Sequence, residues 1–194
     1  MKGSFIISLF STTMAFVSAI PETAKVLPAP VEGYEIVPMK WTGRVDKRGE
    51  DMTFEGHIEE IAAKARETNP DFGRESKPAK RSEFGKLNCG WGGNGEASGT
   101  AIGDGITYLN SFGDGYCGLD GGPYKCAPVS CSYNSAIWLF NDNDTSLRVR
   151  CRDLEPFIRK IYDECYTWGF GESSIQGQLC SNENWNVILG KDKC

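Results

Sequence analysis

The longest uncharged, β-prone run of the chain spans residues 126–140, Cys-Ala-Pro-Val-Ser-Cys-Ser-Tyr-Asn-Ser-Ala-Ile-Trp-Leu-Phe. Its β-branched and aromatic residues predict extended structure at the centre of a sheet. Tyr133-Asn134 is either a two-residue turn, which makes a hairpin of 128–132 and 135–140, or a point within one long strand. We favour the hairpin because Asn tolerates the left-handed backbone conformation that such a turn requires.

Two stretches with helical periodicity flank this run. In the first, Ser98 or Thr100 can cap a helix, and Ile102, Ile106 and Leu109 share one face. The second opens at Asp153, and its apolar face carries Leu154, Phe157, Ile158, Ile161 and Cys165. Residues 175–180 and 185–189 then have the composition of short strands. This order predicts an α+β fold, a small disulfide-stabilised sandwich with two helices on one face of an antiparallel sheet.

A smaller unit precedes this domain. Strand patterns cover residues 34–45 and 52–55, and an apolar face at helical spacing runs from Ile58 to Asn69, where Pro70 ends the helix. The predicted strand-strand-helix unit contains no cysteine and has little core, so it would be marginal alone.

Targeting and processing signals divide the chain. Residues 1–19 resemble a secretory signal peptide that is cleaved after Ala19, and the apolar run is too short for a transmembrane anchor. Lys80-Arg81 is a site for a kexin-type processing protease, at the boundary between a cysteine-free and a cysteine-rich part. We therefore expect a pro-segment at 20–81, a mature domain at 82–194 and a secreted, extracellular product. The alternative is an ordinary charged linker, and Lys47-Arg48 is a second dibasic pair.

The net charge of the chain excludes some classes of binding partner. The formal net charge is −5, and the acidic excess lies after residue 81. An acidic domain is unsuited to bind nucleic acid through its phosphates or to bind a membrane surface through basic residues. We expect no nucleic acid partner, no stable membrane insertion and no cofactor.

All eight cysteines lie after Lys80-Arg81, which predicts up to four disulfides in a secreted domain. A zinc site would need closer Cys-Cys spacing, and only Cys126 and Cys131 approach it. We expect no bound metal. Our expected pairings are Cys131 with Cys165, Cys89 with Cys194, Cys117 with Cys126 and Cys151 with Cys180.

Candidate chemistry is sparse. The single histidine, His57, lies in the expected pro-segment, so the mature domain has no Ser-His or Cys-His nucleophile. A two-carboxylate hydrolase could use Asp104, Asp153, Glu155 or Glu172, although surface carboxylates are the simpler interpretation. Residues 113–118 match G-x-G-x-x-G but lack the strand-to-helix context of a dinucleotide site. Residues 142–146 resemble the start of a calcium loop, but Leu147 stands where the loop needs Gly.

The Gly-rich loops carry the candidate binding residues. These are Trp91, Asp114, Tyr116, Asp120 and Trp168. Trp138 and Trp185 lie on predicted strands and are expected in the core. Asn143 begins an N-glycosylation sequon at a predicted strand end, and whether it is used is left open.

Several spaced motifs resemble a family of small secreted fungal cysteine-rich proteins. They include the segments 129–142 (Val-Ser-Cys-Ser through Asn-Asp), 106–109, 185–188, 38–43, 54–56 and 69–72, together with the terminal Cys194. The resemblance implies a candidate effector with a killer-toxin-like α/β sandwich. Relatives often have a cysteine where this chain has Phe140, and an apolar residue where it has Cys180, so family pairings do not transfer.

Together these features predict a secreted cysteine-rich effector or toxin-like protein that binds an extracellular host or competitor target, a protein or a glycan, without catalysis. The alternative is a secreted carboxylate-dependent hydrolase or carbohydrate-binding protein. A membrane-active killer toxin is a third hypothesis, and the acidic charge counts against it.

Overall fold

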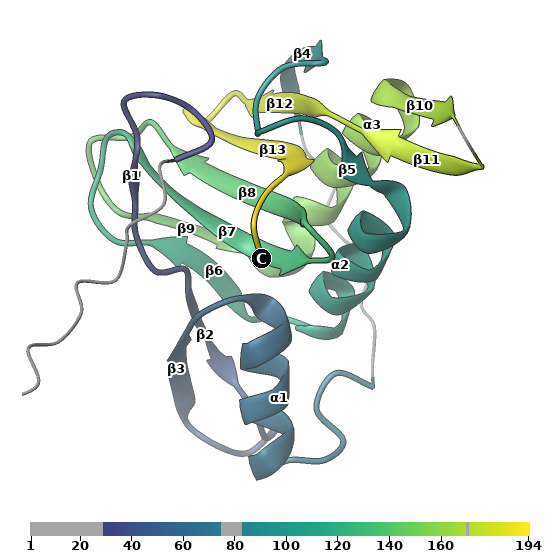
Figure 1. Ribbon diagram of the computed structural model, residues 1–194. Helices are drawn as coiled ribbons and strands as arrows, with labels where there is room; N and C mark the ends of the chain where they lie inside the picture. The colour runs from purple at the N-terminus through teal and green to yellow at the C-terminus, as the bar shows by residue number, and fades with distance from the viewer. Residues whose placement is uncertain (1–28, 75–82, 170) are drawn as a thin grey trace, which may run out of the picture.

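The computed structural model describes residues 29–74, 83–169 and 171–194 (Figure 1). Ala19, Lys80 and Arg81 lie outside these residues, so signal cleavage and dibasic processing stay predictions. The described residues form three α-helices, α1 (Ile58–Thr68), α2 (Gly99–Ser111) and α3 (Glu155–Cys165), and a 3-10 turn, η1 (Cys151–Leu154), leads into α3.

Thirteen strands in this part of the chain form three sheets. The order of the six-stranded sheet is β1 (Glu35–Ile36), β7 (Lys125–Ser132), β8 (Ser135–Asn141), β13 (Trp185–Lys191), β12 (Gly177–Ser181), β4 (Phe84–Cys89). The order of the four-stranded sheet is β3 (Asp51–Glu55), β2 (Lys40–Arg44), β6 (Tyr116–Leu119), β9 (Leu147–Arg150). The order of the three-stranded sheet is β10 (Tyr166–Gly169), β11 (Glu172–Ile175), β5 (Ala97–Ser98).

The central run is a hairpin, as favoured from the sequence. Tyr133 and Asn134 have φ values of 49° and 56°, so both residues of the β7–β8 turn adopt the left-handed conformation. Such a turn matches the right-handed twist of the paired strands. β8 is buried along its whole length and pairs with β7 on one side and β13 on the other.

Helices α2 and α3 pack on the large sheet, with α2 against β7 and β8 and α3 against β4, β12 and β13. Gly105 allows the close approach of α2, because a Cβ there would lie 2.7 Å from Ile137 Cδ1 and 2.8 Å from Ser130 Oγ. Gly103 faces open space, so close packing on the sheet explains only one of these two helix glycines.

The α+β class with antiparallel sheets is confirmed, but the arrangement is richer than two helices on one sheet. Tyr116 and Trp168, which were expected in Gly-rich loops, lie instead on strands β6 and β10. β1 pairs with β7 in parallel. The second helix begins two residues later than expected, because η1 contains Asp153.

The strand-strand-helix unit, β2, β3 and α1, is formed as predicted but does not stand apart. β2 pairs with β6 as well as with β3, and α1 packs on α2. Met39, Trp41 and Ile61 belong to the same buried cluster as Leu109 and Leu139. Residues on both sides of Lys80-Arg81 therefore share one core, and the division into a pro-segment and a mature domain stays a prediction.

The disulfide framework is present, but all four expected pairings are wrong. The bonds are Cys89–Cys165, Cys117–Cys151 and Cys131–Cys194. Cys126 and Cys180 form no disulfide.

A β-bulge in β7 explains why Cys131 does not pair with Cys165. The β7–β8 register shifts between Pro128 and Ser130. Without a bulge, Cys126 and Cys131, five residues apart, would face opposite sides of the sheet. With it, both join a second cluster around Trp138, separate from the main core that contains Cys165. Cys131 therefore meets the C-terminal Cys194 instead of α3.

The two free cysteines occupy one row across the sheet, in which Cys126 is paired with Phe140, Phe140 with Asn186 and Asn186 with Cys180. Three strand spacings separate the thiols by about 14 Å, too far for a disulfide. Burial is the main cause that raises the pKa of Cys126 to about 12, and burial also raises the pKa of Cys180. Both thiols are therefore protonated and weakly reactive at neutral pH.

Because Cys126 lies directly opposite position 140, we expect Phe140→Cys to form a fourth disulfide with Cys126. Thiol titration of the denatured protein should find two thiols in the wild type and only that of Cys180 in the variant. Phe140→Ala, which loses the ring but gains no sulfur, should keep both. An additional titratable thiol in Phe140→Cys would contradict the prediction.

Candidate functional site

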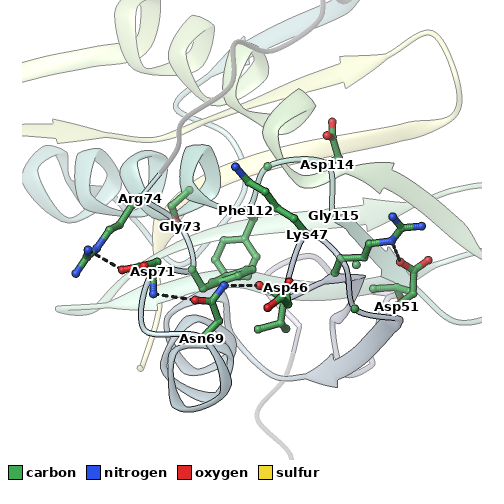
Figure 2. A pocket seen from close by; sticks show the side chains of 18 of the residues that line it. Asp46, Lys47, Asp51, Asn69, Asp71, Gly73, Arg74, Phe112, Asp114 and Gly115 are labelled. Carbon is green, nitrogen blue, oxygen red and sulfur yellow. Dashed lines mark hydrogen bonds and ion pairs between the residues drawn. The ribbon is translucent and has the colours of Figure 1, made fainter.

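A concave site with a volume of about 1550 Å³ lies where three segments converge (Figure 2). Its lining comes from the β2–β3 turn between residues 42 and 51, the loop after α1 between residues 69 and 74, and the α2–β6 connection at residues 111–116. We call this site the charged groove. Pockets for small molecules usually measure about 300–1,000 Å³, so the groove has room for an extended segment of a larger molecule.

The groove is positioned by one buried side chain, that of Trp41. Its indole is fully buried and contacts the rings of Phe72 and Phe112, with both centroid distances 5.6 Å. Gly43 and Gly115 cover the indole and line the groove. A Cβ at 115 would lie 2.1 Å from Trp41 Nε1, and one at 43 would lie 2.7 Å from its Cζ2. Both positions therefore need glycine for close packing.

We expect Gly115→Ala to destabilise the fold by about 1–3 kcal/mol, the usual cost of overpacking a core. Denaturant unfolding measures the change. Gly103→Ala is the matched control, because no atom outside its helix lies within 4 Å of the added methyl group. That variant should gain stability from the higher helix propensity of Ala. A Gly115→Ala protein as stable as the wild type would refute the close packing of Gly115 on Trp41, which forms the apolar floor of the groove with Phe72 and Phe112.

The groove lining carries cations and carboxylates in equal number: Arg44, Lys47, Arg48 and Arg74 with Asp46, Asp51, Asp71 and Asp114. Arg74 Nη1 lies 2.6 Å from Asp71 Oδ1, and Arg44 Nε lies 3.4 Å from Asp51 Oδ1. These side chains are more than half exposed, so the ion pairs contribute little stability. A ligand can therefore replace these ion pairs with contacts of its own at a small cost in free energy.

Asn69 fixes two walls of the groove to each other (Figure 2). Its Nδ2 donates to the Val45 carbonyl at 2.9 Å, which connects the loop after α1 to the β2–β3 turn. Its Oδ1 accepts from the Asp71 backbone N–H at 3.0 Å. The walls are thus held by hydrogen bonds as well as by the apolar floor.

The third wall joins the groove to strand β9. Asp114 Oδ1 lies 2.9 Å from Arg152 Nη1 and 3.5 Å from Arg150 Nη1. Arg148 lies over the ring of Tyr116, with its Cζ 4.1 Å from the centroid, and the Cζ of Arg150 lies 5.8 Å from the same centroid. Tyr116 lines the groove. Arg148 and Arg150 do not line it but contact the Tyr116 ring, which places them just outside the groove, at its rim.

The five candidate binding residues do not form one site. Asp114 and Tyr116 meet in the charged groove. Asp120 follows the other end of β6 and pairs with Lys40. Trp168 is 71% exposed on β10, which Figure 1 shows at the far end of the molecule from β2, β3 and α1.

Trp91 is also exposed and lies near the end of β11, because the neighbouring Gly90 N–H donates to the Gln176 carbonyl at 2.8 Å. Trp138 and Trp185 are buried in the two apolar clusters.

The other candidates are scattered. Asp104 lies on α2 and Glu172 on β11, Asp153 contacts Arg152 at 3.9 Å, and Glu155 pairs with Arg159. None of these four carboxylates lines the charged groove. His57 stands at the N-cap of α1, at the helix end opposite the groove.

Asn143 uses the nitrogen that a glycan would modify. Its Nδ2 donates to Asn141 Oδ1 and to the carbonyls of Glu183 and Asn184, each at 3.1 Å. Glycosylation of Asn143 would take one of the two Nδ2 hydrogens and so break part of this network, and its use stays a prediction.

In the described part of the chain, no helix combines the length and apolar character needed to cross a bilayer. Within residues 29–74, 83–169 and 171–194, no three His, Cys, Asp or Glu side chains are placed to hold a metal ion.

Sequence patterns alone did not predict Arg148, Arg150 or any groove residue before position 75. A usable signal was present in Leu147-Arg-Val-Arg150, where apolar and basic residues alternate as in a strand with one basic face. The groove residues of the N-terminal half had no such signal, since three distant segments meet only in the folded chain.

No model of a known protein family matches the chain, and no similar protein was found among curated proteins or among solved structures.

Proposed function

We propose that this protein is a secreted, disulfide-stabilised effector or toxin-like protein that binds an extracellular target in its charged groove, without catalysis. The observation that carries the proposal is the groove itself, a site of about 1550 Å³ with an apolar floor and a rim of both charge signs. A buried centre with a polar rim is the usual anatomy of a protein-binding surface.

The groove needs both halves of the chain. Its lining runs from Thr42 to Arg74 on one side of Lys80-Arg81 and from Ser111 to Tyr116 on the other. The active form is therefore either the uncut chain from residue 20 onward or a cut chain whose two parts stay together.

Retention of the fluorescently labelled protein on host and competitor cells tests this function. Arg48→Glu/Arg74→Glu reverses two groove charges, and Arg159→Glu/Lys160→Glu makes the same change on α3, away from the groove. The groove variant should lose at least about tenfold in affinity, the effect of a modest loss of contact energy, and the α3 variant should bind normally. Equal retention of all three proteins would overturn the groove as the site.

Catalysis is tested separately. The secreted protein, assayed on a panel of polysaccharides, should show no turnover. Turnover that a single Asp→Ala or Glu→Ala change abolishes would replace the binding function with the hydrolase alternative.

A second function is favoured by one observation at the other end of the molecule. Tyr166 and Trp168 stand two residues apart on β10, 54% and 71% exposed. Exposed aromatic rings provide stacking surfaces for sugars, so a carbohydrate-binding role would use this strand. Trp168→Ala should then abolish retention on an insoluble polysaccharide while leaving cell retention through the groove intact.

A further inference from the structure

The basic residues of the four-stranded sheet differ sharply in how they are neutralised. On β2, Lys40 Nζ lies 3.3 Å from Glu55 Oε1 and also pairs with Asp120, and Arg44 pairs with Asp51. Each cation of β2 thus has a carboxylate from a neighbouring strand or loop.

Strand β9 lacks this compensation. Arg148 is exposed, and among the described residues its guanidinium contacts the Tyr116 ring but no carboxylate. Among the same described residues, Arg150 has one carboxylate within reach, Asp114, and that group lies closer to Arg152. Two guanidinium groups with little compensation therefore stand beside one aromatic ring.

Strand geometry places them side by side. Tyr116 is paired with Arg150, and Gly118 with Arg148, in the β6–β9 register. Arg148 and Arg150 are two residues apart on one strand, so their side chains leave the same face of the sheet. Gly118 contributes no side chain between them, which lets Arg148 reach across to Tyr116.

Neighbouring like charges oppose folding, so this arrangement costs stability unless an anion occupies it. The ring of Tyr116 holds the guanidinium groups by cation–π contact. The arginine side chains therefore lose less conformational entropy when an anion binds. A guanidinium presents its N–H groups as a planar fork that matches a carboxylate or phosphate.

We propose that Tyr116, Arg148 and Arg150 form an oxyanion clamp that receives an Asp or Glu carboxylate from an acidic polypeptide segment lying in the charged groove. The inference rests on the proposed function, because the clamp stands at the rim of that groove. A polypeptide fits better than a uniformly anionic glycan, since a polyanion would also meet Asp46, Asp51 and Asp71. A polypeptide can place its own cations against these groups.

The probe is a fluorescein-labelled acidic peptide of four Glu and two Lys residues spaced by Gly and Ser, with Gln in place of Glu in the matched control peptide. Fluorescence anisotropy with the full secreted protein at low ionic strength measures binding. We expect the Glu peptide to bind, the Gln peptide to bind at least about tenfold more weakly, and inorganic phosphate to compete.

Three variants locate the binding. Arg148→Gln/Arg150→Gln should weaken the Glu peptide at least about tenfold, because each arginine supplies hydrogen bonds to a charged group. Arg159→Gln/Lys160→Gln removes the same formal charge from α3, and its affinity for the Glu peptide should stay within about twofold of the wild-type value. Tyr116→Leu keeps every charge but removes the ring, and should give an intermediate loss that electrostatics alone would not produce. Thermal melts confirm that each variant is folded.

Equal losses in the β9 and α3 variants would overturn the clamp and indicate a general charge effect. If the Gln peptide bound as tightly as the Glu peptide, the clamp would not recognise a carboxylate, and this part of the proposal would be wrong. An oligogalacturonate that binds more tightly than the Glu peptide, with the same dependence on Arg148 and Arg150, would overturn the polypeptide as ligand. If cell retention depends on Arg48 and Arg74 while Arg148→Gln/Arg150→Gln leaves peptide binding unchanged, the clamp fails and the proposed function stands.

Discussion

Residues 82–194 expressed alone should fail to reach the native fold, whereas the same residues produced together with 20–81 should fold as a complex. The reason is the shared core. Residues 29–74 contribute a set of fully or almost fully buried apolar side chains to the main cluster, namely Met39, Trp41, Val45, Ile58, Ile61 and Phe72. At about 1.5–3 kcal/mol for each large side chain, their burial is worth on the order of 10 kcal/mol. That equals the whole stability of a typical domain.

Polar contacts cross the same boundary. Glu35 pairs with Lys125, Tyr34 donates to Asp142, and Ser130 donates to Glu59. Without β2, strand β6 would become an edge whose inner face carries Cys117 and Leu119. An uncovered apolar edge favours aggregation.

Processing should therefore nick the protein without separating its parts. After digestion of the chain from residue 20 onward with a kexin-type protease, the fragments before and after Arg81 should co-elute in native size-exclusion chromatography. They should separate in a denaturing gel even without reductant, because the first 81 residues contain no cysteine. Mass spectrometry distinguishes this cut from one after Arg48, and Arg81→Gln provides the uncut control.

An isolated 82–194 fragment with native disulfides, a cooperative melt and a dispersed NMR spectrum would show that the N-terminal part is dispensable. The charged groove could then not be the binding site of the mature protein, since one side of its lining would be absent.

Local signals account for what the sequence could predict. The Tyr133-Asn134 turn, the helix ending before Pro70 and the apolar face leading to Cys165 each depend on residues within a few positions of one another. The pairing of Cys131 with Cys194 depends on a single bulge between Pro128 and Ser130, for which an uncharged strand carries no distinctive pattern. One inserted residue moved Cys131 to the other face of the sheet.

The charged groove was beyond sequence reasoning for a different reason. The Gly-rich sequence around them predicts Asp114 and Tyr116 as binding residues, but that local sequence does not show which residues lie opposite them. That information resides in Trp41, whose ring brings together Phe72, Phe112 and Gly115. Tertiary packing of this kind joins segments about 70 residues apart in the chain, and no local pattern reports it.

Removing the Cys117–Cys151 bridge should destabilise the protein more than removing either of the other two. The sequence separations of the three bonds are 34, 63 and 76 residues. Chain entropy then assigns about 4 kcal/mol to each bond and differs among them by less than about 1 kcal/mol. Loop length thus hardly ranks the bridges.

The burial of the cysteines predicts which of the three disulfides contributes most to stability. Cys117 and Cys151 are both fully buried, whereas Cys89 and Cys194 are exposed. Loss of the buried sulfurs adds a packing defect to the lost entropy. We expect Cys117→Ala/Cys151→Ala to lose about 4 kcal/mol or more, and Cys131→Ala/Cys194→Ala to lose less. Denaturant unfolding compares the two variants, and the reverse order would refute the argument from burial.

The same bridge should also control the binding site. Cys117 follows Tyr116 on β6, and Cys151 stands between Arg150 and Arg152 at the start of η1, so the bond fixes the ring against the arginines that contact it. At a temperature where Cys117→Ala/Cys151→Ala is still folded, its affinity for the acidic peptide should fall at least about tenfold, because a clamp that must order on binding loses affinity. Cys131→Ala/Cys194→Ala removes a bond outside the groove and should keep the wild-type affinity. An unchanged affinity in the folded Cys117→Ala/Cys151→Ala protein would mean that the β6–β9 pairing alone holds Tyr116 and the two arginines in place.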